Sequence, residues 1–352
     1  MIPAGEPRPI GGERKLLLVD GVRNTLQHTV AAQLSAHLSP NDLVVVNDAA
    51  TLPASLRVRN LDAELRLVGR TSSDREFAAI LFGPGDYHTP TEQRLAPPVV
   101  AVGQTLEFDG ALSAEVVEVD SRSARLVRVR FSLDAERLLL ALYRIGRPIQ
   151  YAHVSDPLAL WDVQNRFAAR PWAFEAPSAG FGLDGEQLVR LRARGVRLAN
   201  LTHAAGISST GSPELDALLP LPERFEIPES TARAVEATAR DGGRIIAIGT
   251  SVVRALESSA LEHGMPRAGQ SEARLRLGAR SERRVVDAVL SGMHEQGTSH
   301  FELLEAFAPA RLLRGAVTEA TRAGYLAHEF GDLCLVRGAP RAGRAAFHPA
   351  AA

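Results

Sequence analysis

The sequence predicts an α/β protein in which a small antiparallel β-barrel domain is inserted into a large α/β domain with a mixed or parallel sheet. Short apolar runs without polar alternation, such as Ile245–Ile248, are typical of strands covered on both faces. These runs alternate with helical patterns near both ends of the chain. Between them, residues 57–131 show period-two alternation and frequent turn residues. We therefore expect a large domain of residues 1–56 and 132–340, an inserted barrel at 57–131, and a disordered tail at 341–352.

Length and composition limit the classes of protein that fit. The chain has 352 residues, enough for two or three domains and a sizeable core. Its formal net charge of -1 gives no overall attraction to nucleic acid, so such binding would need a local basic patch. Cys334 is the only cysteine, which excludes intrachain disulfides, cysteine zinc knuckles and iron–sulfur clusters. No apolar run resembles a signal peptide or a membrane span, so we expect a soluble cytoplasmic protein without a membrane partner.

The N-terminal segment contains two predicted strands. Residues 15–20 form the first, residues 29–37 suit a short helix, and residues 43–46 form the second, buried strand. The second strand leads directly into Asn47 and Asp48. This polar pair either forms a turn or points into a site at the carboxyl end of the strand.

Four segments of the insertion alternate as strands do, at residues 63–68, 76–82, 114–119 and 125–131. Arginines at 122, 125, 128 and 130 are expected on adjoining outer positions of this sheet. They form either a solvated strand face or contacts to a phosphate backbone.

The pattern beyond residue 132 is again α/β. Helices are expected at residues 134–143, 184–195, 228–240, 301–307 and 316–325, with strands at 196–201, 245–248, 285–290 and 333–336. Residues 171–182 resemble a loop lined with aromatic side chains. Residues 267–284 are polar and rich in arginine, which suggests an exposed hairpin.

The strand at residues 245–248 runs into a helix through a polar turn, and the chain is organised around this unit. Gly249 ends the strand, Thr250 and Ser251 are candidate N-cap residues, and Arg254 and Glu257 lie on the polar face of an amphipathic helix. Backbone N–H groups at a helix start favour a carboxylate or another anion, and ligands collect at the carboxyl ends of strands in open α/β sheets. An ordinary connection in which the two hydroxyls only cap the helix explains the same pattern.

Short motifs spread over most of the chain resemble, in the same order, those of one family, the S-adenosylmethionine:tRNA ribosyltransferase-isomerases of queuosine biosynthesis. The stretch GTSVVRALE at 249–257 closely follows the family's GTTSVRTLE, and DLVVVND at 42–48 resembles its GDLLVxND. PSAG at 177–180 is similar to PTAG, and His203 occupies the place of the histidine in TLHVG. Tyr325 with Asp332 is similar to YRFFSYGD, and residues 293–307 align without a gap with the last fifteen residues of NFHLPKSTLLMLVSAF.

The resemblance implies transfer and isomerisation of the ribosyl part of S-adenosylmethionine onto the aminomethyl group of a 7-deazaguanine base in tRNA. Adenine and methionine would leave, S-adenosylmethionine would be the co-substrate, and tRNA would be the partner. The sulfonium acidifies the ribose C5′ proton, so a general base within hydrogen-bond reach is required. No metal is expected, because the histidines and carboxylates lack a ligand spacing such as His-x-x-x-His.

The resemblance also implies site residues. His203 and His294 are candidate general bases, because imidazole titrates nearest neutral pH, and Glu257 joins them as a catalytic candidate. Either histidine could instead be a satisfied structural group, and Arg254 could simply pair with Glu257 on the helix surface. Substrate contacts are expected from Asn47, Asp48, Ser178, Gly180, Thr250, Ser251, Arg254 and Asp332.

The chain departs from the family motifs at several polar positions. Ala50 replaces an arginine, Gly182 a histidine and Gly297 a lysine, and of an MHxE-like segment only Glu223 remains. These changes remove groups suited to phosphate or carboxylate binding and to proton transfer. Two alternatives therefore stay open. One is a diverged paralogue that uses S-adenosylmethionine or a related nucleoside with a non-tRNA acceptor, and the other is a non-catalytic member that binds a nucleoside or RNA.

Overall fold

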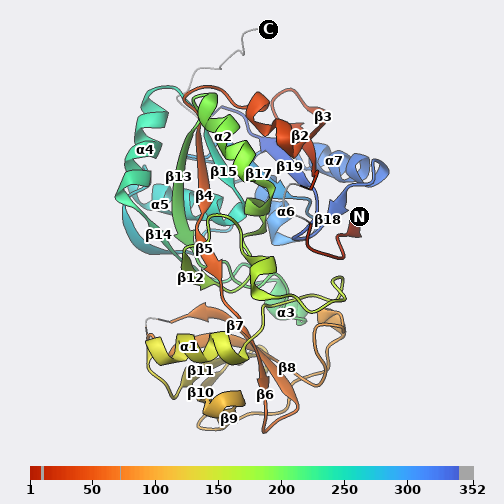
Figure 1. Cartoon of the computed structure of the whole chain (residues 1–352), viewed down its shortest axis with the longest axis vertical. Helices are drawn as coiled ribbons and strands as arrows, with labels where there is room; N and C mark the ends of the chain where they lie inside the picture. The colour runs from red at the N-terminus through yellow and green to blue at the C-terminus, as the bar shows by residue number, and fades with distance from the viewer. Residues whose placement is uncertain (9–11, 72, 341–352) are drawn as a thin grey trace.

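The computed structural model describes residues 1–8, 12–71 and 73–340 and consists mainly of two sheets, a large one above and a smaller one below in Figure 1. The predicted tail at 341–352 lies outside the described residues. The large sheet has nine strands in the order β16-β14-β13-β4-β15-β17-β19-β2-β3. In chain order they are β2 (Lys15–Asp20), β3 (Thr25–Val30), β4 (Leu43–Asn47), β13 (Arg197–His203), β14 (Glu223–Ile227), β15 (Ile245–Ile248), β16 (Gly269–Ala273), β17 (Ala288–Gly292) and β19 (Leu333–Arg337).

The centre of the large sheet is parallel. Strand β4 pairs in parallel with both β13 and β15, and β15 pairs in parallel with β17. The outer strands include antiparallel pairs, among them β17 with β19 and β13 with β14, so the sheet is mixed as predicted. Because the four central strands run in one direction, their carboxyl ends meet at one edge of the sheet.

The central strands are apolar throughout because helices cover both faces. In β15, Ile245 and Ala247 pack in one core, while Ile246 and Ile248 pack in the other, as the two-residue period of a strand requires. The first core is formed with α4 (Glu229–Arg240), α5 (Thr250–His263), α6 (Ser299–Leu304) and α7 (Ala310–Arg322). The second is formed with the 3₁₀ helices η1 (Ala31–His37) and η5 (Ser178–Gly182) and with α2 (Gly185–Ala193), which lies in front of the sheet in Figure 1.

The smaller sheet is antiparallel and nearly closed into a barrel. Its order is β6-β7-β8-β11-β10-β9, and the backbone N–H of Arg59, just after β6, donates to the Glu107 carbonyl of β9 at 2.7 Å, which links the two edges. Helix α1 (Ala135–Ile145), capped by the Asp134 side chain, packs on its core. The strands are β6 (Ser55–Val58), β7 (Ala63–Arg70), β8 (Glu76–Phe82), β9 (Thr105–Glu107), β10 (Ser113–Val119) and β11 (Leu126–Phe131). The division into domains at residues 57 and 131 stays a prediction.

Short elements complete the described chain, and none of its helices is long and apolar enough to span a bilayer. Two small parallel pairs join distant segments: β1 (Ile2–Pro3) with β18 (Leu326–Ala327), and β5 (Ala49–Thr51) with β12 (Arg170–Ala173). The remaining elements are η2 (Thr91–Gln93), η3 (Asp109–Ala111), η4 (Leu160–Val163) and α3 (Pro213–Asp216).

Two local predictions are wrong. Residues 267–284 do not form an exposed hairpin, because β16 pairs with β14 and extends the large sheet. The predicted outer face of arginines excludes Arg125, which is buried. Its guanidinium donates to the Arg94 carbonyl at 2.6 Å and lies 5.1 Å from the centre of the Phe82 ring. Arg122 lies in the connection between β10 and β11, where it pairs with Asp120, so it is not on the strand face either. Arg128 and Arg130 are on β11 and pair with Glu118 and Glu76 of the same sheet.

Candidate functional site

Polar side chains gather where the four parallel strands of the large sheet end. Asn47 is the last residue of β4, His203 is the last of β13, Ser251 lies in the first turn of the helix after β15, and His294 follows β17. Since β13, β4, β15 and β17 are neighbours in that order, the fold brings together groups that lie far apart in the sequence.

The Asn47 side chain connects the ends of β4 and β13 to the start of α5 by hydrogen bonds. Its Oδ1 accepts hydrogen bonds from the backbone N–H groups of His203 at 2.9 Å and Ala49 at 3.0 Å. Its Nδ2 donates to the His203 carbonyl at 3.0 Å and to Ser251 Oγ at 3.3 Å. All four hydrogen-bonding positions of this buried amide are therefore used to position other residues of the site.

Asp48 is held by side chains of β13. Its Oδ1 accepts from Thr202 Oγ1 at 2.6 Å, and its Oδ2 accepts from Asn200 Nδ2 at 2.5 Å. The carboxylate is buried, so these two bonds fix its orientation at the same sheet edge.

The start of α5 differs from the prediction. Neither Thr250 nor Ser251 is the N-cap; that position belongs to Gly249, and no side chain caps the helix. Gly249 has φ 94°, ψ 155°, a conformation that is essentially restricted to glycine. A Cβ there would also lie 3.4 Å from Ala179 Cβ of η5, so the glycine lets η5 approach the helix start. The first N–H groups of α5 keep the capacity to bind an anion.

Residues 252–260 of helix α5 are buried, and tertiary contacts neutralise the two charged residues among them, Arg254 and Glu257. Arg254 is only 4% exposed and forms an ion pair with Glu223. Its guanidinium also donates to the carbonyl oxygens of Ala273 at 2.7 Å, and of Leu221 and Leu275 at 3.3 Å each. Burial lowers the pKa of Arg254 to about 10, so the side chain remains charged at neutral pH.

Glu257 does not pair with Arg254 on a helix surface. It is 1% exposed, and its two oxygens accept three backbone N–H groups, those of Arg284, Val285 and Val286, at 2.6 to 2.9 Å. Through these three hydrogen bonds the Glu257 carboxylate fixes the backbone of residues 284–286, just before β17. The arrangement favours a structural role for Glu257 over the catalytic role expected from the sequence.

His203 is fully enclosed and faces the Arg254–Glu223 pair. Its Nε2 lies 3.5 Å from Glu223 Oε2, and neither ring nitrogen has a hydrogen-bond partner among the residues that the structure describes. Burial, together with the charge of Arg254, holds the pKa of His203 well below its usual range. The other Glu223 oxygen, Oε1, accepts from the Gly206 N–H at 2.6 Å. His203 is therefore a neutral imidazole beside a fixed ion pair.

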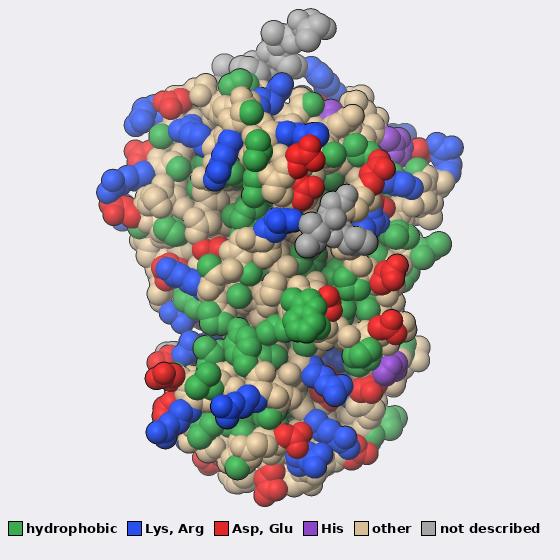
Figure 2. Space-filling view, viewed as in Figure 1, with side chains coloured by type: hydrophobic (Ala, Val, Ile, Leu, Met, Phe, Trp, Pro, Cys, Tyr) green, Lys and Arg blue, Asp and Glu red, His purple; other side chains and the backbone are tan. Residues whose placement is uncertain are grey.

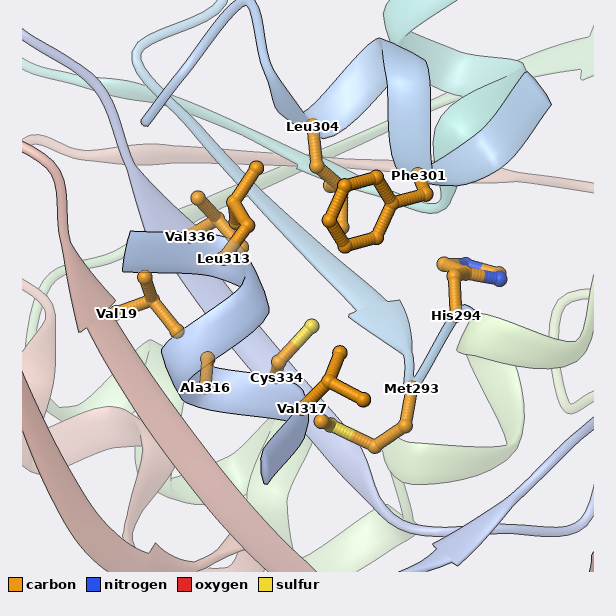
Figure 3. A pocket seen from close by; sticks show the side chains of 10 residues that line it. All are labelled: Val19, Met293, His294, Phe301, Leu304, Leu313, Ala316, Val317, Cys334 and Val336. Carbon is orange, nitrogen blue, oxygen red and sulfur yellow. The ribbon is translucent and has the colours of Figure 1, made fainter. Parts of the chain in front are cut away.

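His294 is only half-buried and is oriented by two neighbours. Its Nε2 is hydrogen-bonded to Ser291 Oγ at 2.6 Å, and its ring stacks on that of His300 with centroids 4.8 Å apart. Figure 3 shows the imidazole at the edge of a small apolar cavity of about 10 Å³, with its nitrogens turned away from the apolar side chains. Burial holds the pKa of His294 well below its usual range and, with the charge of Arg254, lowers that of His300 to about 4.

Sequence reasoning missed His300, although a second histidine six positions after His294 on the following helix was a visible signal. The stacking of the two rings depends on the turn between β17 and α6, which the local pattern does not specify. The structure thus adds His300 to the candidate site.

Two further predicted site residues, Gly180 and Asp332, have structural roles. In η5, which also contains Ser178, a Cβ on Gly180 would lie 2.7 Å from Asn165 Nδ2, so glycine permits close contact there. Asp332 is 1% exposed and accepts the backbone N–H groups of Lys15 and Leu326, both at 2.8 Å. Asp332 therefore joins the start of β2 to the start of β18, which belong to different sheets, and its carboxylate also forms an ion pair with Arg8 at 2.9 Å.

A cavity of about 300 Å³ lies between the two sheets, next to this group of residues. Its walls come from β7, α1, β12 and β14 and include Glu223, Trp172 and Arg224. The Arg224 guanidinium lies 4.2 Å from the centre of the Trp172 ring. Figure 2 shows hydrophobic side chains gathered where the upper and lower parts of the molecule meet. The cavity has the size and mostly apolar lining of a small-ligand site with a few polar groups.

Known proteins resemble this chain over nearly its whole length. The family model described as queuosine biosynthesis protein matches residues 2–336. An S-adenosylmethionine:tRNA ribosyltransferase-isomerase of Gloeobacter violaceus is 32% identical over 341 residues, covering 95% of this chain and 92% of that protein. A Sorangium cellulosum protein of the same name is 32% identical over 358 residues, covering 96% of each.

A solved structure supports the fold. The crystal structure of S-adenosylmethionine tRNA ribosyltransferase from Thermotoga maritima aligns with a TM-score of 0.51 and 21% sequence identity. The alignment covers 95% of this chain and 96% of the other. At this identity the likeness concerns the architecture, a large mixed sheet combined with a barrel-like antiparallel sheet.

Proposed function

The chain belongs to the queuosine biosynthesis protein family, and from this membership we propose that it is an S-adenosylmethionine:tRNA ribosyltransferase-isomerase. It transfers and isomerises the ribosyl moiety of S-adenosylmethionine onto a 7-aminomethyl-7-deazaguanine base in tRNA. The products are epoxyqueuosine in tRNA, adenine and methionine. S-adenosylmethionine is a co-substrate, tRNA is the macromolecular partner, and a cytoplasmic location stays a prediction.

The observation that carries this proposal is the end-to-end match to named ribosyltransferase-isomerases in a chain whose polar residues meet at one sheet edge. The relatives favour this reaction over a non-tRNA acceptor or a non-catalytic role. Ala50, Gly182 and Gly297 remain departures from the family motifs. His300, stacked on His294, supplies one additional polar group close to the altered loop.

We assign the proton transfer from the ribose C5′ to His294. A base must be neutral before the reaction, and the lowered pKa of His294 keeps its ring neutral at pH 7. An imidazole that donates from Nε2 to Ser291 Oγ retains Nδ1 as its proton acceptor. His294 is also half-buried, whereas His203 is fully enclosed. Loss of the C5′ proton leaves a carbanion stabilised by the adjacent sulfonium. Its electron pair forms a C4′–C5′ double bond as the C4′–O4′ bond breaks, O4′ becomes the carbonyl oxygen at C1′, and adenine leaves from C1′ with the electron pair of its bond.

In this proposal His203, Glu223 and Arg254 do not react with the substrate but support the residues that contact it. The neutral His203 ring contacts an ion pair whose arginine is fixed by three carbonyl groups. This arrangement keeps the β13 end rigid and provides a fixed dipolar wall on one side of the substrate.

Two further features, the N-terminus of α5 and the cavity between the sheets, are the proposed binding sites for the substrates. The uncapped N-terminus of α5, at Thr250 and Ser251, suits the methionine carboxylate of S-adenosylmethionine. The cavity between the sheets suits a base, because Trp172 offers an aromatic surface and Arg224 a cation at its wall. We propose that the extruded tRNA base enters there, next to Glu223.

The proposal is tested with purified protein, S-adenosylmethionine, and tRNA that carries or lacks the aminomethyl-deazaguanine base. We expect adenine release and a ribosyl mass increase on the tRNA only when the modified base is present. Binding of S-adenosylmethionine without adenine release on the modified tRNA would contradict the proposal and favour a different acceptor. Binding of the tRNA without binding of S-adenosylmethionine, by a folded protein, would favour the non-catalytic, RNA-binding role.

A further inference from the structure

We propose that His153, His328 and Glu329 form a binding site for one divalent transition-metal ion of the zinc type. These residues lie outside the group at the carboxyl ends of the parallel strands, and the proposal does not depend on the reaction assigned above. One ligand atom from each residue lies within 4.8 Å of the others. The sequence spacing gave no sign of this set, because His153 and Glu329 are 176 positions apart.

The distances suit a metal after small side-chain movements. Bonds of about 2.0–2.1 Å in a tetrahedral zinc site place neighbouring ligand atoms about 3.3–3.5 Å apart. His153 Nε2 already lies 3.1 Å from Glu329 Oε2, and the rings of His153 and His328 are 4.4 Å apart between centroids. The ligand atom of His328 has to approach the other two by up to roughly 1.5 Å, which rotation of its exposed side chain provides.

The backbone of the turn between β18 and β19 directs two consecutive side chains to the same place. His328 has φ 65°, in the left-handed region that L-residues rarely adopt. Its carbonyl accepts the Gly331 N–H at 2.9 Å, which closes the turn. In an extended segment, successive side chains would point in opposite directions. The turn instead places His328 and Glu329 together beside His153.

The donor set indicates the class of metal. Two imidazoles with one carboxylate are typical of zinc sites that keep a coordination position open, and imidazole favours Zn²⁺ over Mg²⁺ or Ca²⁺. A dication with one carboxylate keeps a net positive charge, so the open position suits water or an anionic group. The exposed side of His328 provides an entry path for the ion.

A bound ion would connect segments that are distant in the chain. His153 follows α1, and His328 and Glu329 follow β18, which pairs with β1 at the N-terminus. The Ala4 N–H donates to the Ala327 carbonyl at 3.0 Å, next to the proposed ligands. Metal binding would therefore stabilise the contact between the N-terminal segment and the turn of residues 328–331.

The test is calorimetric titration of the full chain, without a histidine tag and after removal of metals by chelation, with Zn²⁺ alone. We expect one ion per chain, and four-coordinate Co²⁺ should give an intense visible absorption at the same site. His328→Asn retains a residue that tolerates positive φ, and Glu329→Gln retains the side-chain shape. Each should weaken Zn²⁺ binding by at least about 10–100-fold, the loss typical for even an outer partner of a metal ligand.

His88→Asn is the matched control, because His88 pairs with Asp86 at 2.8 Å on an exposed part of the smaller sheet's loops. This variant should bind Zn²⁺ as the natural chain does. Circular dichroism and thermal unfolding without metal establish that each variant is folded. Equal Zn²⁺ affinity in the natural chain, His328→Asn and Glu329→Gln would overturn the proposal, as would absence of stoichiometric binding to the natural chain. In both cases His153 and Glu329 form only an ion pair, and His328 only packs against the His153 ring.

Discussion

Asn47 and His203 are joined by two hydrogen bonds in which the Asn47 side chain replaces a partner strand. Its Oδ1 accepts from the His203 N–H at 2.9 Å, and its Nδ2 donates to the His203 carbonyl at 3.0 Å. The same amide group donates to Ser251 Oγ at the start of α5. One buried side chain thus sets the relative position of β4, β13 and α5, the elements that carry Asn47, His203 and Ser251.

Replacement of Asn47 by Asp tests this arrangement. The carboxylate can still accept the N–H of His203, but it cannot donate to the His203 carbonyl, and two acceptors then face each other. We expect a loss of about 2–4 kcal/mol in the free energy of unfolding, together with lower activity. Asn60→Asp is the matched control, because Asn60 also bridges two backbone groups, at Thr105 and Glu107, but is exposed. Equal destabilisation of both variants in urea titrations would contradict the account.

Glu257→Gln separates a structural role from a catalytic one. The carboxylate accepts three backbone N–H groups, and the amide that replaces one oxygen would point its own N–H groups at them. We expect a loss of roughly 2–3 kcal/mol of stability but little change in kcat for the folded fraction at low temperature. The exposed Glu262 on the same helix supplies the control Glu262→Gln. A loss of kcat without a loss of stability would instead assign Glu257 to the reaction.

Gly249→Ala should damage both stability and the site. Alanine is strained at φ 94°, and its Cβ would lie 3.4 Å from Ala179 of η5. Gly264 at the other end of α5 also has a positive φ of 81°, but a Cβ there meets nothing within 4 Å among the described residues. We expect Gly249→Ala to lose about 2–3 kcal/mol and Gly264→Ala about 1 kcal/mol. Only the first should raise the KM for S-adenosylmethionine, because only Gly249 sits at the proposed carboxylate site.

Stability should fall as the solution becomes acidic, because the site contains neutral histidines with lowered pKa values. The pKa of His300 is lowered from 6.5 to about 4, so between these values the unfolded chain binds a proton that the folded chain excludes. The stabilisation is present above pH 6.5 and is lost as the pH falls towards 4, by up to about 3 kcal/mol. The lowered pKa values of His203 and His294 act in the same direction.

Urea unfolding at about pH 7 and about pH 4.5 measures this dependence. His300→Gln should lose less stability between the two pH values than the natural chain does. His88→Gln, at an exposed position, should match the natural chain. A His300→Gln variant with unchanged pH dependence would show that other groups cause the acid sensitivity.

Much of the large sheet could be predicted from the sequence, because strands covered on both faces need uninterrupted apolar residues. Residues 245–248 and 15–20 match β15 and β2 for this reason. The mixed α/β class and the antiparallel insertion are confirmed by the fold. The position of His203 and His294 at one edge also follows from parallel strands, because their carboxyl ends meet there.

The errors occur where long-range contacts override a local pattern. Arg254 and Glu257 look like the exposed face of a helix, yet Glu223 and backbone groups of distant segments neutralise them inside the protein. A single chain contains no local signal for such partners. The same limit applies to Arg125, which is buried against Phe82, and to the edge strand β16, whose polar sequence suggested a hairpin.

The most direct test of the central claim is adenine release from S-adenosylmethionine on tRNA that carries the aminomethyl-deazaguanine base, measured by mass spectrometry for three proteins. The natural chain and His263→Gln, a control at the half-exposed C-terminal end of α5, should release adenine at equal rates. His294→Gln should be slower by about 10²–10⁴-fold, the usual contribution of general acid–base catalysis, while S-adenosylmethionine binding is retained. Release by His294→Gln at the natural rate, or no release by the natural chain, would contradict the account.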